Sequence, residues 1–370
     1  MEPALQLHLG RRWRLRRRWV ELIVRSLISI VLAVAATPAP ALAPEAAAAA
    51  KVTGKTIATN LEVPWGIAFL PNGDALVAER TTGEIKRVPR DGGSARTVKT
   101  LGAADTRAGE GGLLGLAVSP DYKRDKLVYA YYTSRTDNRI TRFKLNGAEK
   151  AVLTGIERGF IHNGGRIAFG PDGKLYAGTG EVGQTGLSQD RSSPNGKILR
   201  LNPNGSAPKD NPIKGSIVFS LGHRNVQGLA FDSKGRLWAA EFGQDRFDEV
   251  NLIKPGRNYG WPIVEGRAST QGGRFENPKV TWGTSEASPS GAAIVGSRLY
   301  VAALQGEGVY SIKLNGTRAG TPRLLYGGRY GRVRTVVKAP GGGIWFSTSN
   351  RDGRGSPRPG DDRIIRAPAN

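Results

Sequence analysis

A pattern that occurs six times constrains this chain more than any other feature of its sequence. Each copy holds an apolar segment, a tight turn and a second apolar segment. The copies read WGIAFLPNGDALVAER at 65–80, GLAVSPDYKRDKLVYAYY at 115–132, GRIAFGPDGKLYAGTGE at 165–181, QGLAFDSKGRLWAAEFG at 227–243, GAAIVGSRLYVAAL at 291–304 and TVVKAPGGGIWFSTSN at 335–350. Alternating apolar residues are typical of half-buried strands, and PNG, PDG and SKG supply the residues of a tight hairpin turn.

A third, more polar strand follows each pair. These strands read GEIKRV, NRITRFKL, GKILRLN, DEVNLI, GVYSIKL and DRIIRA. Small sheets that recur at roughly 40 to 60 residues are typical of blades around an axis. The sequence therefore predicts an all-β, six-bladed β-propeller over residues 51–370, with a β-sandwich as the alternative. Residues 182–222 and 244–290 are expected to be insertions between blades that carry function.

Composition removes several classes of chemistry. With 51 glycines and 22 prolines the chain has too many turns for a helical bundle. It has no cysteine, which excludes disulfides, thiolate metal sites and cysteine nucleophiles. There are three histidines, His8, His162 and His223, so histidine-based chemistry must use one of these.

The first fifty residues are expected to form a signal peptide with an Ala/Pro-rich linker. An arginine-rich start, an apolar run over about 22–36 and the small-residue stretch TPAPALAPEAAAAA follow one another. Cleavage after Ala43 and after Ala50 both fit, and the alternative is an anchor that stays attached. We expect a periplasmic or secreted protein without stable membrane insertion after cleavage.

The formal net charge of +23 is scattered through the chain rather than gathered in blocks. A scattered surplus favours solubility and loose attraction to anionic surfaces. The chain carries no recognised nucleic-acid-binding motif, so nucleic acid is not an expected partner.

Polar residues that enter the inner strands are the candidates for chemistry. His162 in FIHNGGRIAFG precedes one such strand and suits a general base, although a histidine that only satisfies its loop would read the same. His223, Arg224 and Asn225 precede the next strand and suit an electron-rich ligand, with a salt bridge between blades as the alternative.

Two further loops are candidates for ion binding. The stretch 240–262 is rich in oxygen ligands, including Asp245, Asp248 and Glu249, and suits calcium or a solvated acidic turn. Arg329, Arg332 and Arg334 open the last blade. Alternate residues of an extended segment face the same way, so Arg332 and Arg334 can grip one anion or form an exposed charged edge.

Taken together, these stretches resemble the glucose/sorbosone dehydrogenase family of soluble quinoprotein aldose sugar dehydrogenases. The resemblance is carried by VPWGIAFLPNG, GEGGLLGLAVSPDY, HNGGRIAFGPDGKLY, GKILRLNPNG, LGHRNVQGLAF and DEVNLIKPGRNYGWP. It implies a six-bladed propeller that binds pyrroloquinoline quinone (PQQ) and calcium and oxidises the C1 hydroxyl of an aldose to the lactone, for an unknown electron acceptor.

The resemblance also implies roles for single residues. His162 matches the base, Arg224 and Asn225 match quinone contacts with Arg224 stabilising charge on the quinone, and Arg332 and Arg334 match the pair that grips the cofactor's carboxylates. Glu110 falls where some members place a glutamine that contacts the quinone. Gly243 and Gln244 match the catalytic calcium site, and Glu249 and Tyr259 resemble a second, structural calcium site.

Two positions depart from the family. Gln305 stands where some members carry a lysine that contacts the cofactor. The acid beside the histidine is expected to be Glu181, one carbon longer than in some members. Loss of the lysine keeps open a sugar- or surface-binding propeller without cofactor, and a calcium-dependent lactonase is the enzymatic alternative.

Overall fold

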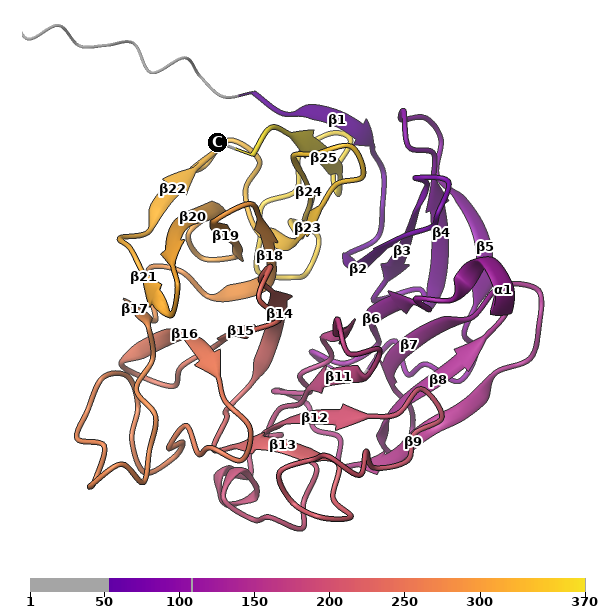
Figure 1. The fold of residues 1–370 in the computed structure, drawn as a ribbon. Helices are drawn as coiled ribbons and strands as arrows, with labels where there is room; N and C mark the ends of the chain where they lie inside the picture. The colour runs from indigo at the N-terminus through magenta and orange to yellow at the C-terminus, as the bar shows by residue number, and fades with distance from the viewer. Residues whose placement is uncertain (1–52, 108, 370) are drawn as a thin grey trace, which may run out of the picture. The chain divides into compact units, whose positions relative to one another are not determined.

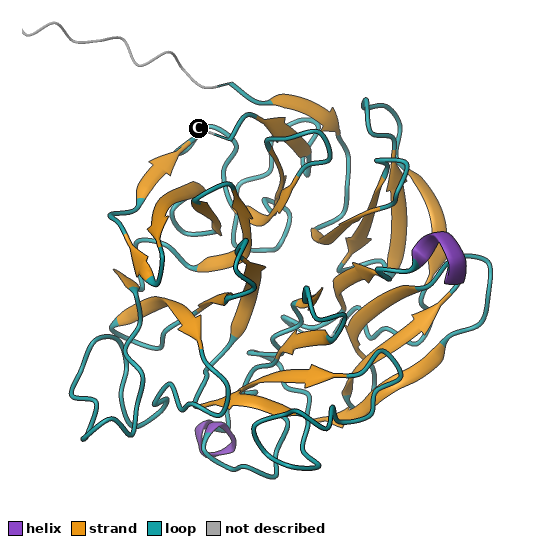
Figure 2. Cartoon of the chain, in the orientation of Figure 1, coloured by secondary structure: helices purple, strands orange, loops and turns teal. Residues whose placement is uncertain are grey.

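A computed structural model gives the structure of residues 53–369, apart from residue 108. The signal segment expected at residues 1–50 lies outside this described part. Within it the regular structure consists of strands, one short helix, α1 (Tyr122–Asp125), and one 3-10 helix, η1 (Thr185–Ser188) (Figure 2). None of the helices between residues 53 and 369 has the length and apolar character that a membrane span requires.

The strands form six antiparallel sheets, which confirms the predicted six-bladed propeller (Figure 1). The first strands, which contact one another around the axis, are β2 (Pro64–Phe69), β6 (Leu113–Val118), β10 (Ile167–Phe169), β14 (Val226–Phe231), β18 (Pro289–Val295) and β23 (Val333–Lys338). The second strands are β3 (Ala75–Glu79), β7 (Val128–Thr133), β11 (Leu175–Gly178), β15 (Leu237–Glu241), β19 (Arg298–Ala303) and β24 (Ile344–Thr348).

The outer half of each blade follows in the same order. The third strands are β4 (Glu84–Val88), β8 (Asn138–Phe143), β12 (Lys197–Leu201), β16 (Phe247–Ile253), β20 (Gly308–Asn315) and β25 (Ile364–Ala367). The fourth strands are β5 (Arg96–Thr100), β9 (Lys150–Ile156), β13 (Val218–Leu221), β17 (Val280–Gly283), β22 (Arg323–Leu325) and β1 (Lys55–Ala58). The short strand β21 (Arg318–Ala319) adds to β20. We number the blades one to six by their first strands, β2 to β23.

The two ends of the described chain meet in blade six. Strand β1 pairs with β25, with Lys55 opposite Arg366 and Thr56 opposite Ile365. The indigo β1 lies beside the yellow β25 in Figure 1. The first strand of the chain thus completes the last sheet and closes the ring.

The prediction of two insertions between blades is wrong. Residues 182–222 contain β12 and β13, and residues 244–290 contain β16 and β17. The irregular segments lie inside blades three and four, between their successive strands. Long connections separate the successive strands of these blades, which is why the sequence pattern looked like an insertion.

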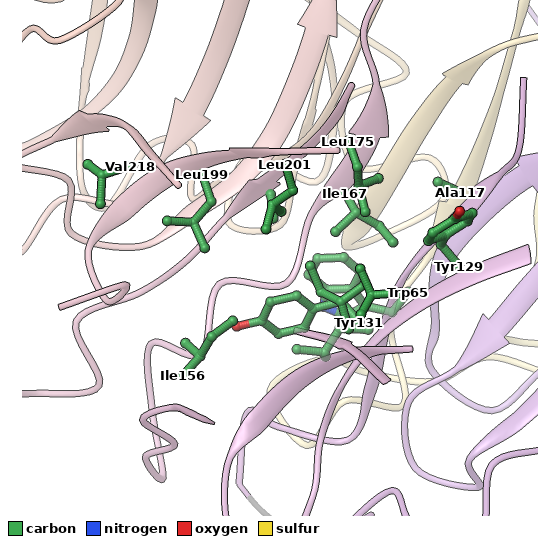
Figure 3. Packing of buried hydrophobic residues seen from close by; sticks show 14 residues of the cluster. Trp65, Ala117, Tyr129, Tyr131, Ile156, Ile167, Leu175, Leu199, Leu201 and Val218 are labelled. Carbon is green, nitrogen blue, oxygen red and sulfur yellow. The ribbon is translucent and has the colours of Figure 1, made fainter. Parts of the chain in front are cut away.

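Apolar side chains fill the space between neighbouring blades. The cluster in Figure 3 combines Trp65 of blade one, Tyr131 of blade two and Leu175 of blade three, all nearly inaccessible to solvent. Such contacts between blades fix the inner strands, so the loops at their ends are held in place.

The inner strands approach one another closely at one level of the axis. At the same position of the repeat, Gly66, Gly115, Gly228 and Gly291 occupy four of the inner strands. A Cβ atom on Gly115 would lie 2.1 Å from the carbonyl oxygen of Gly165 in the next blade. Blade three carries Arg166 at this position and blade six carries Thr335.

Arg166 connects four blades. Its Nε donates to the carbonyl oxygen of Gln227 in blade four (2.7 Å), and its Nη2 donates to Oγ1 of Thr335 in blade six (2.9 Å). The guanidinium lies 4.2 Å from the ring centre of Trp65 in blade one. Burial lowers the pKa of Arg166 to about 9.

Gly115→Ala is expected to destabilise the protein by about 1–3 kcal/mol, because the added methyl group meets backbone that cannot move away cheaply. Gly102→Ala, where a Cβ would meet nothing within 4 Å, is the matched control and should stay near wild type. Thermal unfolding of both variants measures the difference. Equal melting temperatures for the two variants would contradict the close approach.

Candidate active site at one face of the propeller

The candidate residues gather where the inner strands begin and the second strands end. In an antiparallel hairpin these two points lie at the same edge of the sheet. His162 and Arg224 precede β10 and β14, and Arg332 precedes β23, while Glu181 and Asp352 follow β11 and β24. The repeat therefore brings residues from many parts of the chain to one face of the propeller.

His162 is held in a fixed orientation by two acids. Its main-chain N–H donates to Oε2 of Glu110 (3.0 Å), and its ring atom Nδ1 bonds Oε1 of Glu181. Glu181 is buried, and its Oε2 has no hydrogen-bond partner within the described residues. A carboxylate on Nδ1 leaves Nε2 as the ring atom that can take up a proton. The structure thus places Glu181 beside His162 as expected.

Asn225 connects this loop to the next blade. Its Oδ1 accepts a hydrogen bond from the N–H of Gly164 (3.0 Å), two residues after His162. The side chain is fully buried, and its Nδ2 donor has no partner among the described residues. An unpaired buried amide is costly, so this donor is available for a ligand acceptor.

His223 is structural. It is fully buried, its Nδ1 bonds Oε1 of Glu241 (2.8 Å), and its Nε2 bonds Oγ of Ser220 (2.8 Å). Its ring stacks on Tyr259 with centres 4.7 Å apart. Both ring nitrogens are occupied, so of the two described histidines it is His162 that is available for proton transfer.

Arg224 joins the predicted quinone contacts to the predicted calcium loop. Its Nε donates to Oε1 of Gln244 (3.0 Å), and its main-chain N–H donates to Oε2 of Glu241 (2.9 Å). The guanidinium lies 5.5 Å from the ring centre of Trp261. Burial lowers the pKa of Arg224, although nearby acids, Glu181 first, oppose this.

Arg332 and Arg334 are buried and face one carboxylate. Nε and Nη2 of Arg332 each lie 3.1 Å from Oδ2 of Asp352, and Nη2 of Arg334 lies 3.4 Å from the same oxygen. Nη1 of Arg334 donates to Oε1 of Gln227 (2.9 Å), and its Nε has no partner in the described structure. Burial lowers the pKa of Arg334 to about 10. The pair is therefore buried against a carboxylate and does not form an exposed charged edge.

A pocket of about 220 Å³ opens beside these arginines. Its wall includes Trp65, Arg80, Glu110, Phe160, Arg334 and Asp352. Phe160 is 77% exposed, although the loop that carries it is fixed because Asn163 bonds both the N–H and the carbonyl of Gly159. The pocket thus combines buried cations with an exposed aromatic ring.

Gln305 does not line this pocket. It is exposed in the turn after β19, and the residue of the wall at this point is Leu304. Its main-chain N–H donates to the carbonyl of Ala287 (3.1 Å). Gln305 is therefore not among the residues that line the pocket with the buried arginines.

The expected calcium residues lie around the hairpin between β15 and β16. The N–H of Gly243 donates to Oδ1 of Asp248 (3.0 Å) and that of Gln244 to Oε1 of Glu265 (2.7 Å). Glu249 and Tyr259 border a cavity of about 10 Å³, enough for one water-sized particle. Burial, and then repulsion by Glu241, raises the pKa of Glu249 to about 8.

No group of three or more His, Cys, Asp or Glu side chains arranged around a metal is found in residues 53–369. The hydroxyl of Tyr259 donates to the carbonyl of Leu252 (2.7 Å). Calcium here would therefore depend on main-chain carbonyls together with Glu249, which suits a hard cation that prefers oxygen ligands.

Sequence reasoning missed Arg80, Asp352 and Lys197. Arg80, Glu181 and Asp352 all lie shortly after the second strand of their repeats, so the repeat pattern already indicated this position. Lys197 is fully buried, and its Nζ donates to the carbonyls of Leu187 (2.6 Å) and Asn195 (2.7 Å). It thereby fixes the loop that follows Glu181.

Comparison with known proteins places this geometry among sugar dehydrogenases. The family model described as glucose/sorbosone dehydrogenase matches residues 61–364. A solved structure of the PQQ-bound aldose sugar dehydrogenase from Streptomyces coelicolor has a TM-score of 0.82 and 52% identity, covering 85% of this chain and 96% of its own.

Curated relatives point the same way. Quinoprotein glucose dehydrogenase B of Acinetobacter calcoaceticus is 36% identical over 265 residues, which are 60% of this chain. The chain spans only 55% of that relative's length. The aldose sugar dehydrogenase of Escherichia coli is 28% identical over 350 residues, 83% of this chain and 92% of the relative.

Lys197 should give the stability a specific dependence on pH. Burial lowers the pKa of Lys197 to about 8 from its ordinary 10.5, so between these values the unfolded chain binds the extra proton. The free energy of unfolding should therefore gain a contribution on the order of 3 kcal/mol as the pH rises from 8 to 10.5.

Denaturant unfolding of wild type and Lys197→Met across this pH range measures that contribution as a difference. Lys174→Met, which changes a partly buried lysine of the same blade, is the control and should follow wild type. Parallel pH profiles for wild type and Lys197→Met would show that Lys197 carries no such shift.

Proposed function

The chain belongs to the glucose/sorbosone dehydrogenase family, and on that premise we propose that it oxidises the C1 hydroxyl of an aldose to the lactone with PQQ as hydride acceptor. The observation that carries the proposal is the pairing of His162 with the buried Glu181. This pair lies at the same propeller face as several buried arginines and a pocket whose wall holds Arg334 and Phe160.

The residues present fit PQQ by their unpaired donors. Nε of Arg334 and Nδ2 of Asn225 are buried without hydrogen-bond partners in the described residues. A planar anion that is rich in carboxylate and carbonyl oxygens would supply acceptors for both. Arg332 and Arg334 would hold its carboxylates, and Arg224 and Asn225 would contact its quinone oxygens.

His162 performs the proton transfer in this mechanism. Its Nε2 accepts the proton of the C1 hydroxyl, and Glu181 on Nδ1 keeps the ring oriented and stabilises the imidazolium that forms. When bound, PQQ would supply the two-electron oxidant that takes up the C1 hydrogen as a hydride. Arg224 provides a fixed positive charge for the negative charge that develops during this transfer.

Calcium belongs to the proposal as well. The carbonyl oxygens of Gly243 and Gln244 would hold one ion beside Arg224, and Glu249 with Tyr259 would hold a second beneath the hairpin. The exposed ring of Phe160 gives apolar surface to the face of a sugar ring. We further propose that the protein is exported to the periplasm or secreted, on the strength of the pattern in residues 1–50.

His162→Ala should lower kcat for aldose oxidation by about 10²–10⁴-fold, because the base is lost. Glu181→Gln should lower kcat less, because the imidazole remains but loses its charged partner. Dye-linked oxidation of an aldose panel by protein reconstituted with PQQ and calcium measures both effects. Glu149→Gln, which alters a carboxylate remote from the pocket, is the control. A His162→Ala protein that keeps most of its activity would refute this choice of base.

Calcium should raise the melting temperature of the protein, and chelation should lower it, because an ion that binds only the folded state stabilises it. A hundredfold excess over Kd would add about 2.7 kcal/mol. Glu249→Gln should remove much of this response. The shift is measured from that variant's own metal-free melting temperature, because both oxygens of Glu249 accept hydrogen bonds, from Asn251 and Gly266. Glu286→Gln, at an exposed site, is the control. A full calcium response in Glu249→Gln would exclude this residue as a ligand.

A further inference from the structure

Arg80 differs from every other buried arginine of the described chain. Six arginines there are buried, and five donate hydrogen bonds from their side chains: Arg166, Arg200, Arg224, Arg332 and Arg334. Arg80 is 8% exposed, and its Nε is buried without a partner among the described residues. Its guanidinium makes no hydrogen bond or ion pair with any residue that the structure describes.

The backbone, rather than the side chain, holds Arg80 in place. Its N–H donates to the carbonyl of Val63 (3.1 Å), and its own carbonyl accepts from the N–H of Leu113 (3.2 Å). Gly112 has a φ of +116° and lies against the backbone of Arg80. A Cβ atom on Gly112 would lie 2.3 Å from the carbonyl oxygen of Arg80. The guanidinium is thus kept at the pocket wall without contacts of its own.

The acids near Arg80 are committed elsewhere. Oδ2 of Asp352 already accepts from Arg332 and Arg334. Glu110 bonds Nη2 of Arg354 (3.0 Å) and the N–H of His162 (3.0 Å). Burial lowers the pKa of Arg80. The acids Asp352 and Glu110 oppose this shift, and the cations Arg354 and Arg332 add to it. The fold therefore keeps a cation in the pocket wall that no described residue pairs with directly, at a cost in stability.

We propose that Arg80 of blade one is a third cation, besides Arg332 and Arg334, for the carboxylates of PQQ. This inference rests on the proposed function. A bound carboxylate would give the unpaired guanidinium its missing acceptor and recover the cost of its burial.

Arg80→Met tests the assignment because it should change stability and binding in opposite directions. Without cofactor, the apolar side chain replaces an unpaired buried charge, so the melting temperature should stay equal or rise. Calorimetric titration with PQQ in calcium should show affinity weaker by about 30-fold or more. Arg80→Lys keeps a charge without the guanidinium fork and should recover only about threefold of this loss, so it should stay about tenfold weaker than wild type.

Arg87→Met is the matched control. Arg87 lies in the next strand of the same blade and pairs with Asp74, so its loss removes the same net charge away from the pocket. PQQ affinity should then stay within about threefold of wild type.

Three results would overturn the assignment. Arg80→Met could bind PQQ as wild type does, or it could lower the melting temperature of the cofactor-free protein, which would reveal a structural role. If Arg80→Met does not fold, Arg80→Lys takes its place. An Arg80→Lys protein that binds PQQ as tightly as wild type and Arg87→Met would then refute the assignment. A wild-type protein that binds no PQQ would instead refute the proposed function and this inference with it, so the two failures are distinguishable.

Discussion

The contacts of Arg166 across the propeller axis fix the geometry on which the site depends. Four inner strands carry glycine where blade three carries this arginine, so the strands pack closely and leave room for one long side chain. Its bonds to Gln227 and Thr335 and its contact with Trp65 tie four blades together. Gln227 in turn accepts from Arg334, so the same side chain that fills the centre also orients a residue of the pocket.

The second constraint is that the buried arginines at the axis and at the pocket face outnumber the acids that pair with them. Arg166, Arg332 and Arg334 are buried at the axis and its pocket face, and Asp352 is shared by the last two. Buried charges that are incompletely paired cost stability, and an anionic ligand can recover that cost. The proposed binding of PQQ would recover part of this cost, and the same low-polarity surroundings strengthen the contact of His162 with Glu181.

Much of the fold could be predicted because the strands and turns of the repeat are local patterns. The pairing of β1 with β25 could not, because residues about 310 apart leave no local signal of their contact. For the site, the loop positions of His162, Arg224 and Arg332 and the proximity of Glu181 followed from the sequence. Asp352 and Arg80 were missed although both lie shortly after second strands of the repeat. Asp352 meets Arg332 and Arg334 across the two ends of one hairpin of blade six. Arg80, in contrast, reaches the same pocket only once blades one and six meet. The sequence alone could not show whether the side chain of Gln305 faces the cofactor site. In the structure Leu304, and not Gln305, belongs to the pocket wall.

The central claim is that the buried arginines of this face bind PQQ. Calorimetric titration of the purified protein with PQQ in the presence of calcium tests it most directly, because it needs neither substrate nor electron acceptor. The account predicts saturable binding of one PQQ per chain, with affinity that falls as salt is added. Absence of binding heat, together with an unchanged melting temperature at saturating PQQ, would contradict it.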